Sequence, residues 1–202
     1  RADPGPLQDF CLADLNSPLF INGYPCRNPA LATSDDFIYS GFKQAPSGFD
    51  QWGLNVTFVT AGQFPALNTL GLTINRCVLL PGGSTQFRTN PRASSLVMAT
   101  EGEILEGFYS TNDNQLYVKR LTPGDLFIIP PGLMHFTVNV GTGNATFYAS
   151  LNSQNPGGQI VGLMDETVIA HLKAQYPNVV SQMLPSVNDR INSKIPVIKL
   201  PL

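Results

Sequence analysis

The sequence predicts an all-β fold, an antiparallel sandwich or barrel followed by a short helical segment at the C-terminal end. Short runs rich in β-branched and aromatic residues recur from residue 36 to residue 151. Clusters of Gly, Pro or Asn separate these runs, as turns separate the strands of an antiparallel sheet. After residues 155–158, Asn-Pro-Gly-Gly, the apolar residues change to the spacing of a helix.

The nine segments expected to be strands span residues 36–40, 55–60, 70–80, 94–100, 103–109, 115–121, 125–130, 135–140 and 145–152. Residues 164–177 are expected to form a helix, because Val168, Ile169 and Leu172 follow a helical spacing and Pro177 ends it. A second short helix is expected around residues 179–184. The final segment, 191–202, is expected to be extended and to pack its apolar side chains on a partner.

The composition fits one domain with a substantial core, since the chain has 202 residues and 43% of them are hydrophobic. A net charge of −2 and a charged fraction of 13% leave no basic surface for a phosphate backbone. We therefore expect no nucleic-acid partner. No apolar run approaches the ~18 residues of a spanning helix, so we expect no membrane association. The low charge suggests that other subunits or glycan cover part of the surface.

The N-terminal segment indicates a secreted protein. The chain begins with Arg-Ala-Asp-Pro-Gly-Pro and has neither an initiator Met nor an apolar leader, which is typical after removal of a signal peptide. Cys11 and Cys26 flank a turn-rich loop, and an oxidising compartment would allow them to bridge. Cys77 lies in an expected strand, where a buried and unreactive thiol is favoured. The sequons at Asn55 and Asn144 adjoin turns and are candidate glycosylation sites.

Two glycine-framed motifs lie between residues 81 and 141. The second motif consists of Gly124, Pro130, Gly132, His135 and Asn139, and the first is framed by Gly82 and Gly102. Their spacings resemble the two motifs of cupins, in the form that germins and germin-like proteins carry. Further germin-like segments are 7–11, 64–71, 90–93, 132–136 and 153–157.

This resemblance implies a cupin jelly-roll β-barrel over residues 36–158 within a single domain. Residues 1–35 would form a disulfide-bridged N-terminal segment, since germins carry a bridge that corresponds to Cys11 and Cys26. Residues 159–202 would form a helical and extended oligomerisation segment, as germin C-terminal helices clasp neighbouring subunits. We therefore expect a homo-oligomer, a dimer, trimer or hexamer, in the plant apoplast. The placement of Asn55 matches the family, so we expect glycan there before Asn144.

The residues that bind metal in germins are largely replaced. Germins hold manganese with three histidines and one glutamate, for oxalate oxidation or superoxide dismutation. Arg88, Asn90 and Ser95 stand at three of these positions, and only His135 matches. A guanidinium repels a dication, and one imidazole with a neutral amide cannot hold manganese against water. We therefore expect no metal and no cofactor; His171, on the predicted C-terminal helix, is not expected to be a ligand.

The resemblance places these polar residues at the barrel mouth, together with Asn75, whose counterpart lies in the family's substrate pocket. Arg88 offers two donors to a carboxylate or an enolate-like oxygen and disfavours protonation of His135. A neutral imidazole is a usable general base, so His135 and Arg88 are the candidate catalytic residues. No other residue placed there by the resemblance titrates near neutral pH. The candidate substrate-binding residues are Asn75, Asn90 and Ser95, with Phe87 and Phe136 as a candidate apolar wall.

The favoured function is therefore that of a secreted, metal-free cupin that binds a small oxygenated organic molecule in its barrel. It would convert this molecule by cofactor-independent acid–base catalysis, as an isomerase, cyclase or lyase. The alternative is a non-catalytic binding or structural glycoprotein of the apoplast with a relic pocket. A manganese oxalate oxidase or superoxide dismutase is disfavoured by the replaced ligands. A roomy cavity shared by Arg88, Asn75 and His135 would favour catalysis, and a barrel filled by side chains would favour the structural alternative.

Overall fold

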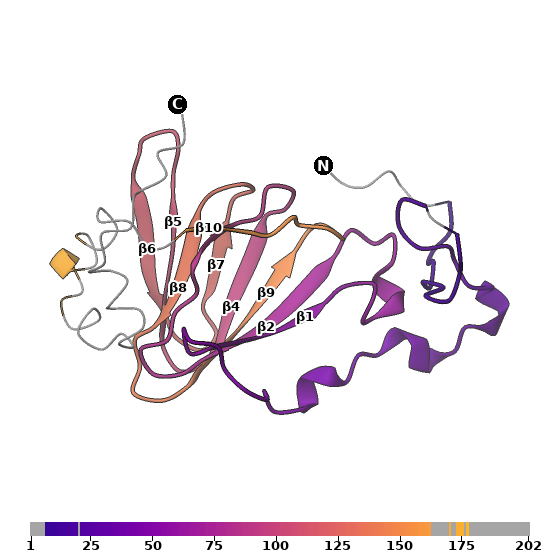
Figure 1. Cartoon of the computed structure of the whole chain (residues 1–202), viewed down its shortest axis with the longest axis horizontal. Coiled ribbons are helices and arrows are strands. Elements are labelled where there is room, and N and C mark those ends of the chain that lie inside the picture. The colour runs from indigo at the N-terminus through magenta and orange to yellow at the C-terminus, as the bar shows by residue number, and fades with distance from the viewer. Residues whose placement is uncertain (1–6, 20, 163–169, 171–172, 176, 178–202) are drawn as a thin grey trace.

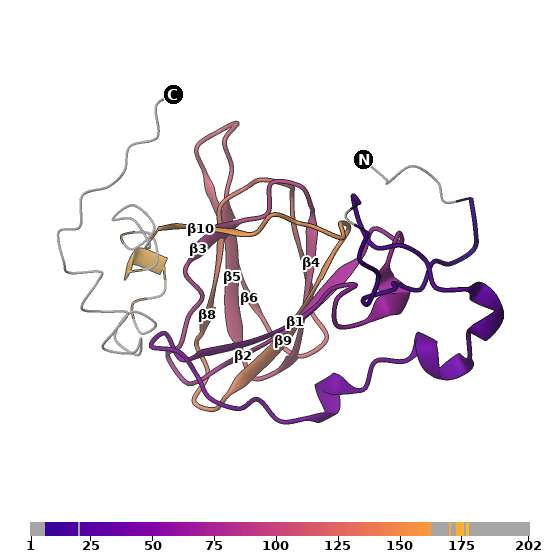
Figure 2. The same cartoon turned by 45° about the vertical axis from the view of Figure 1, so that its right-hand side comes forward.

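Two five-stranded antiparallel sheets face each other and enclose a barrel (Figures 1 and 2). The computed structural model describes residues 7–19, 21–162, 170, 173–175 and 177. The first sheet has the order β1 (Leu54–Val59), β2 (Thr73–Leu79), β9 (Ala145–Leu151), β4 (Ser95–Glu101) and β7 (Leu126–Ile129). The second has the order β10 (Gln159–Gly162), β3 (Phe87–Thr89), β8 (His135–Asn139), β5 (Ile104–Tyr109) and β6 (Leu116–Leu121). This arrangement confirms the predicted all-β barrel.

Four short 3-10 helices precede or interrupt the strands: η1 (Pro29–Leu31), η2 (Ser34–Phe37), η3 (Gly41–Lys43) and η4 (Pro65–Leu67). The prediction of a strand at residues 36–40 was wrong. Asp36 accepts hydrogen bonds from the backbone N–H and the hydroxyl of Thr33, at 2.8 and 3.1 Å. This capping box stabilises the N-terminus of η2. Local capping therefore overrides the β preference of the aromatic and branched residues that follow. The short strands β3 and β10 were not predicted.

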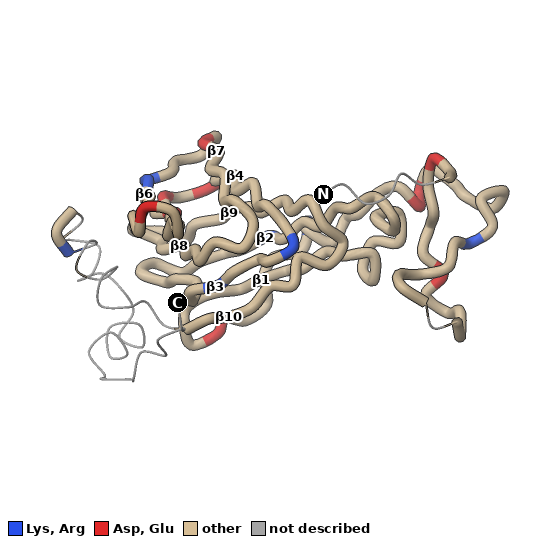
Figure 3. The backbone as a smooth tube through the Cα atoms, turned by 90° about the horizontal axis from the view of Figure 1, so that it is seen from above, with Lys and Arg blue, Asp and Glu red and all other residues tan. Residues whose placement is uncertain are grey.

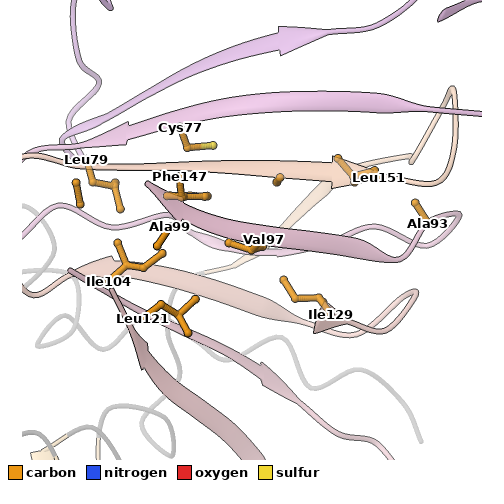
Figure 4. Close-up of a cluster of buried hydrophobic side chains, with 12 residues drawn as sticks. Cys77, Leu79, Ala93, Val97, Ala99, Ile104, Leu121, Ile129, Phe147 and Leu151 are labelled. Carbon is orange, nitrogen blue, oxygen red and sulfur yellow. The ribbon is translucent and has the colours of Figure 1, made fainter. Parts of the chain in front are cut away.

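The apolar core lies between the sheets, and three of its members, Cys77, Ala149 and Leu151, also form the floor of the cavity at the barrel mouth. Strand β4 shows how it forms, since Val97 and Ala99 point inward and are buried, whereas Leu96 and Met98 point outward and are exposed. Figure 4 shows the cluster of inward side chains. Its members are Cys77, Leu79, Ala93, Val97, Ala99, Ile104, Leu121, Ile129, Ala145, Phe147, Ala149 and Leu151.

The motif residues Asn139 and Gly102 hold the turns at the closed end of the barrel. Asn139 Nδ2 donates hydrogen bonds to the carbonyl oxygens of Leu79, Leu80 and Gly143, at 2.9–3.0 Å. Gly102 has a φ of +70°, and a Cβ at this position would lie 2.5 Å from the Asn144 carbonyl oxygen. These residues therefore serve the fold and not the barrel mouth.

The N-terminal segment packs on the loop that precedes β2, to one side of the sheets (Figure 1). Cys11 and Cys26 form the predicted disulfide, and Cys77 is free and buried, as expected. Asn68 is buried beside the bridge, and its Nδ2 donates to the Tyr24 carbonyl oxygen at 2.9 Å. The disulfide closes the N-terminal loop, and hydrogen bonds from Asn68 to Tyr24 and from Ala13 to Pro65 tie that loop to the segment that carries η4.

Charged residues are sparse along both sheets (Figure 3), in line with the low charge of the sequence. The expected helix at 164–177 lies mostly outside the described residues; those described within it, residues 170, 173–175 and 177, are helical. The expected helix at 179–184, the final segment at 191–202 and His171 lie outside the described residues. Within the described part of the chain, no helix combines the length and the apolar character that a membrane span requires.

Candidate functional site

A cavity of about 480 Å³ occupies the barrel mouth. Strands β1, β2, β3, β4, β8 and β9 line it, and residues 154–160 close one side. The lining contains all five polar residues that were expected there: Asn75, Arg88, Asn90, Ser95 and His135. The opposite wall, from β1, is largely apolar and consists of Leu54, Val56 and Phe58. The barrel mouth is therefore open, although side chains fill the remainder of the barrel.

Strand alternation determines which residues face the cavity. Arg88 on β3 pairs directly with His135 on β8, so the two side chains share the inner face of their sheet. The neighbouring residues Phe87 and Phe136 consequently lie on the opposite face. There both are buried, and their ring centroids are 5.3 Å apart in an edge-to-face contact. The expectation that Phe87 and Phe136 form the pocket wall was therefore wrong.

His135 is held as a neutral imidazole in one orientation. Its Nδ1 lies 3.0 Å from the Leu133 carbonyl oxygen and donates to it, which leaves Nε2 as an acceptor. Nε2 lies 3.5 Å from Asn90 Nδ2. Burial, and secondarily the Arg88 charge, lower the pKa of His135 to about 3, against the opposing effect of the Leu133 hydrogen bond. In the free protein His135 is therefore an acceptor of hydrogen bonds and only a weak base.

Behind Arg88 lies a buried carboxylate that the sequence interpretation missed. Arg88 Nη2 donates to Thr137 Oγ1 at 3.2 Å, and Thr137 Oγ1 donates to Glu106 Oε2 at 2.7 Å. Glu106 is completely buried, and its Oε1 has no hydrogen-bond partner among the described residues. The three side chains form one directed chain of hydrogen bonds from β3 through β8 to β5.

Burial raises the pKa of Glu106 to about 7, against the lowering effects of the Arg88 charge and the Thr137 hydrogen bond. Glu106 lies outside the set of residues that the resemblance placed at the site, whereas the expectation that His135 titrates near neutral pH was wrong, because its pKa is about 3. Alternation contained the signal: Ile104 and Phe108 pack toward the core, and Glu106 lies midway between them on the same face. Acidic side chains are rarely buried in a strand, so the alternation alone does not single out Glu106.

The side chains at the barrel mouth do not fit a manganese ion. At the positions that correspond to the family's ligands, one imidazole, one amide and one hydroxyl are too few and too weakly charged as donors, and the Arg88 cation lies among them. Within the described residues, no group of three or more His, Cys, Asp or Glu side chains is placed to hold a metal. Glu106 does not line the cavity and is reached only through Thr137.

The segment over the cavity is positioned by Arg92. Its Nε and Nη2 donate to the Asn155 carbonyl oxygen and to Asn155 Oδ1, at 2.8 and 2.6 Å. Gly158 follows, and a Cβ at this position would lie 3.3 Å from Asn90 Oδ1. Cys77 lines the cavity, and burial raises the pKa of its thiol to about 12, so it is not a nucleophile there.

The two sequons differ in accessibility. Asn144 is exposed in the turn before β9. Asn55 lies on β1, and its Nδ2 donates to the Gly48 carbonyl oxygen at 2.7 Å. Glycan on Asn55 would leave one Nδ2 hydrogen for this hydrogen bond and would have to fit beside Gly48, whereas Asn144 lies in an exposed turn.

Comparison with known proteins identifies similar sequences. The cupin family model matches residues 40–186. Germin-like protein 1-2 of Oryza sativa subsp. japonica is 47% identical over 156 residues, which cover 77% of this chain and 69% of that protein. Germin-like protein subfamily 1 member 14 of Arabidopsis thaliana is 41% identical over 184 residues, which cover 89% of this chain and 82% of that protein.

Solved structures show the same architecture. An oxalate oxidase superimposes with a TM-score of 0.75 at 33% identity, covering 94% of this chain and 98% of that one. The oxalate decarboxylase of Bacillus subtilis has a TM-score of 0.53 at 15% identity, covering 79% of this chain and 44% of that one. The second similarity concerns the fold alone.

Proposed function

This chain belongs to the cupin family and to its germin-like members, and from that premise we propose that it binds a small oxygenated organic molecule and converts it by metal-free acid–base chemistry. The observation that carries the proposal is the convergence of Arg88, Asn75 and His135 on one cavity of about 480 Å³. A cavity of this size, with few polar groups and an apolar wall, is typical of a site for a small organic ligand.

Arg88 is the proposed anion-binding residue. Among the described residues its guanidinium makes a single hydrogen bond, to Thr137, so further N–H groups are available to a ligand in the cavity. A planar guanidinium binds a carboxylate or an enolate-like oxygen through two parallel hydrogen bonds. The substrate class is therefore a small molecule that carries, or develops during reaction, a negative charge on oxygen.

His135 is the proposed proton acceptor. In the free protein the Arg88 charge contributes to its low pKa. An anionic group bound at Arg88 would offset that charge, so His135 becomes a stronger base in the complex than in the free protein. Its acceptor atom Nε2 lies on the same side as Asn90, which would orient the substrate together with Asn75 and Ser95. A proton moved between two carbons, or lost with a leaving group, gives an isomerase, cyclase or lyase reaction.

The alternative is a non-catalytic binding or structural glycoprotein. The complete burial of Glu106 behind Arg88 argues against a relic pocket, because an unsatisfied buried carboxylate costs stability and has no structural benefit of its own. An oxalate oxidase activity like that of the solved neighbour is disfavoured, because the donor set at the barrel mouth does not fit manganese.

The experiment incubates the purified protein with a plant metabolite extract and identifies by mass spectrometry the compounds that are retained or converted. We expect His135→Gln to bind the substrate but to convert it about 10²–10⁴-fold more slowly than wild type. Arg88→Met should weaken both binding and rate. The control is Arg120→Met, which removes an exposed arginine on β6 that pairs with Glu103. Retention without conversion supports the non-catalytic alternative, and conversion that His135→Gln leaves unchanged removes His135 from the mechanism.

We further infer that the protein is secreted to the apoplast and assembles as a homo-oligomer. Secretion is supported by the disulfide, which persists in oxidising compartments. Assembly is supported by two exposed apolar pairs across β4 and β7, Leu96 with Ile128 and Met98 with Leu126. A second copy of the chain would bury these side chains.

A further inference from the structure

We propose that Glu106 couples anion binding in the barrel to the uptake of one proton. A carboxylate that pairs with Arg88 supplies the negative charge that Glu106 otherwise supplies, and Glu106 then takes a proton from solvent. No bond in the ligand changes in this step. The inference rests on the proposed role of Arg88 as the anion-binding residue.

The hydrogen-bond chain gives the coupling a physical path. Arg88 lines the cavity, whereas Glu106 lies behind it and is joined to it through the Thr137 hydroxyl. Because Thr137 donates to Glu106, the chain is directed toward a carboxylate oxygen and strengthens when Glu106 is ionised. Glu106 therefore acts through Arg88 and Thr137 without touching the ligand.

The burial of Glu106 makes Arg88 its decisive partner. Its second oxygen, Oε1, is buried and has no hydrogen-bond partner among the described residues. One hydroxyl hydrogen bond is too little to hold an ionised carboxylate in the barrel interior. The neighbouring positive charge supplies the remaining stabilisation, and a ligand anion on Arg88 would cancel it.

The other groups around Glu106 cannot replace Arg88. His135 on β8 and Cys77 on β2 are neutral near pH 7, because burial lowers the pKa of the imidazole and raises the pKa of the thiol. Lys119 pairs with Glu106 across β5 and β6, but it is exposed and its charge acts on Asp125. Strand β7 contributes the apolar side chains of Phe127 and Ile129.

The direction of the pH effect follows from linkage. The pKa of Glu106 is about 7 with Arg88 free, and it rises when an anion cancels the Arg88 charge. Below about pH 7 Glu106 is already protonated, so anion affinity does not depend on pH. Above about pH 7 each bound anion brings one proton with it, and the affinity falls by up to about tenfold per pH unit.

The test uses isothermal titration calorimetry with benzoate, which stays ionised from about pH 6 to about pH 9, and with benzamide as the neutral counterpart. Wild-type protein should bind benzoate with constant affinity up to about pH 7 and with falling affinity above it. Glu106→Gln keeps an acceptor for Thr137 and should bind benzoate equally at about pH 6, and more tightly than wild type at about pH 9. Glu103→Gln, at a partly exposed carboxylate one residue before β5, should retain the wild-type pH profile.

Two outcomes are distinguishable. If wild-type protein binds neither benzoate nor any of a panel of small carboxylates, the anion-binding function of Arg88 is overturned and the coupling with it. If benzoate binds with an affinity that is independent of pH, or if Glu106→Gln keeps the pH dependence, only the coupling is overturned. Should Glu106→Gln fail to fold, titrations of wild type in buffers of different ionisation enthalpy count the proton directly, and zero protons at about pH 8 contradicts the coupling.

Discussion

Arg88 and His135 are direct neighbours across β3 and β8, so a permanent positive charge faces a buried imidazole. The Arg88 charge disfavours protonation of His135 and repels a metal cation from it. The imidazole stays neutral, its orientation is fixed by the Leu133 carbonyl oxygen, and its free nitrogen points toward Asn90.

The first prediction concerns the protonation of His135. Ring-nitrogen NMR should show a proton on Nδ1 and none on Nε2, without titration until the pH falls well below 6.5 toward its pKa of about 3. Arg88→Met removes one of the two causes and should raise this pKa, while burial keeps it below the usual value. The urea-unfolded chain, in which imidazoles titrate near their usual pKa of about 6.5, is the control. Titration of His135 near neutral pH in the folded protein would contradict the prediction.

The second prediction concerns stability and Glu106. The folded protein holds the Glu106 proton more tightly than the unfolded chain, because the pKa rises from 4.5 to about 7 on folding. Glu106 should therefore contribute a loss of about 3 kcal/mol in the free energy of unfolding between about pH 4.5 and about pH 7. His135 contributes in the opposite direction below about pH 6.5, because folding lowers its pKa to about 3, so the Glu106 loss is measured as the difference between wild type and Glu106→Gln. Glu106→Gln should lack this loss, as measured by urea unfolding across the pH range. Glu103→Gln is the matched control, and an equal pH dependence in both variants would contradict the burial of an ionisable Glu106.

The third prediction concerns manganese. Protein purified from manganese-supplemented medium should contain far less than one manganese per chain and should lack oxalate oxidase and superoxide dismutase activity, because the donor set at the barrel mouth is inadequate. The triple variant Arg88→His, Asn90→His, Ser95→Glu supplies three imidazoles and one carboxylate and should bind the metal. Elemental analysis decides both, and about one manganese per unmodified chain would overturn the prediction.

The fourth prediction concerns the cysteines. Non-reduced peptide mapping should recover Cys11 linked to Cys26, and Cys77 should resist alkylation until the protein unfolds, because burial holds its pKa at about 12. The bridge closes a loop with a sequence separation of 15 residues. Its removal by Cys11→Ser with Cys26→Ser should cost about 3 kcal/mol in the chain-entropy model. Rapid alkylation of native Cys77 would show that the thiol is accessible and ionised.

The fifth prediction concerns assembly. Light scattering should show at least a dimer at micromolar concentration. Met98→Glu with Leu126→Glu places two charges on one of the two exposed apolar pairs and should shift the protein toward monomer. Thr111→Glu, in the exposed turn between β5 and β6, should leave the oligomer intact. A wild-type monomer would refute assembly, and an oligomer that survives the double variant would place the interface elsewhere.

The sequence by itself was sufficient for the fold and for the polar residues at the barrel mouth. The glycine, proline and asparagine spacings carry the resemblance to the cupin motifs, and that resemblance placed Arg88, Asn90, Ser95 and His135 at the barrel mouth. Such signals are local, since they depend on which residues tolerate a turn and on the alternation of a strand.

Only the tertiary structure revealed Glu106, because its importance depends on contacts between three strands that are distant in sequence. Its position in β5 looks like that of any acid in an amphipathic strand, and only the packing of β8 and β3 shows that it is buried behind Arg88. The same holds for Phe87 and Phe136, which flank the site in sequence but lie on the other face of the sheet. Burial and the sign of a pKa shift are properties of the packed barrel, in which desolvation and charges from several strands act on one group.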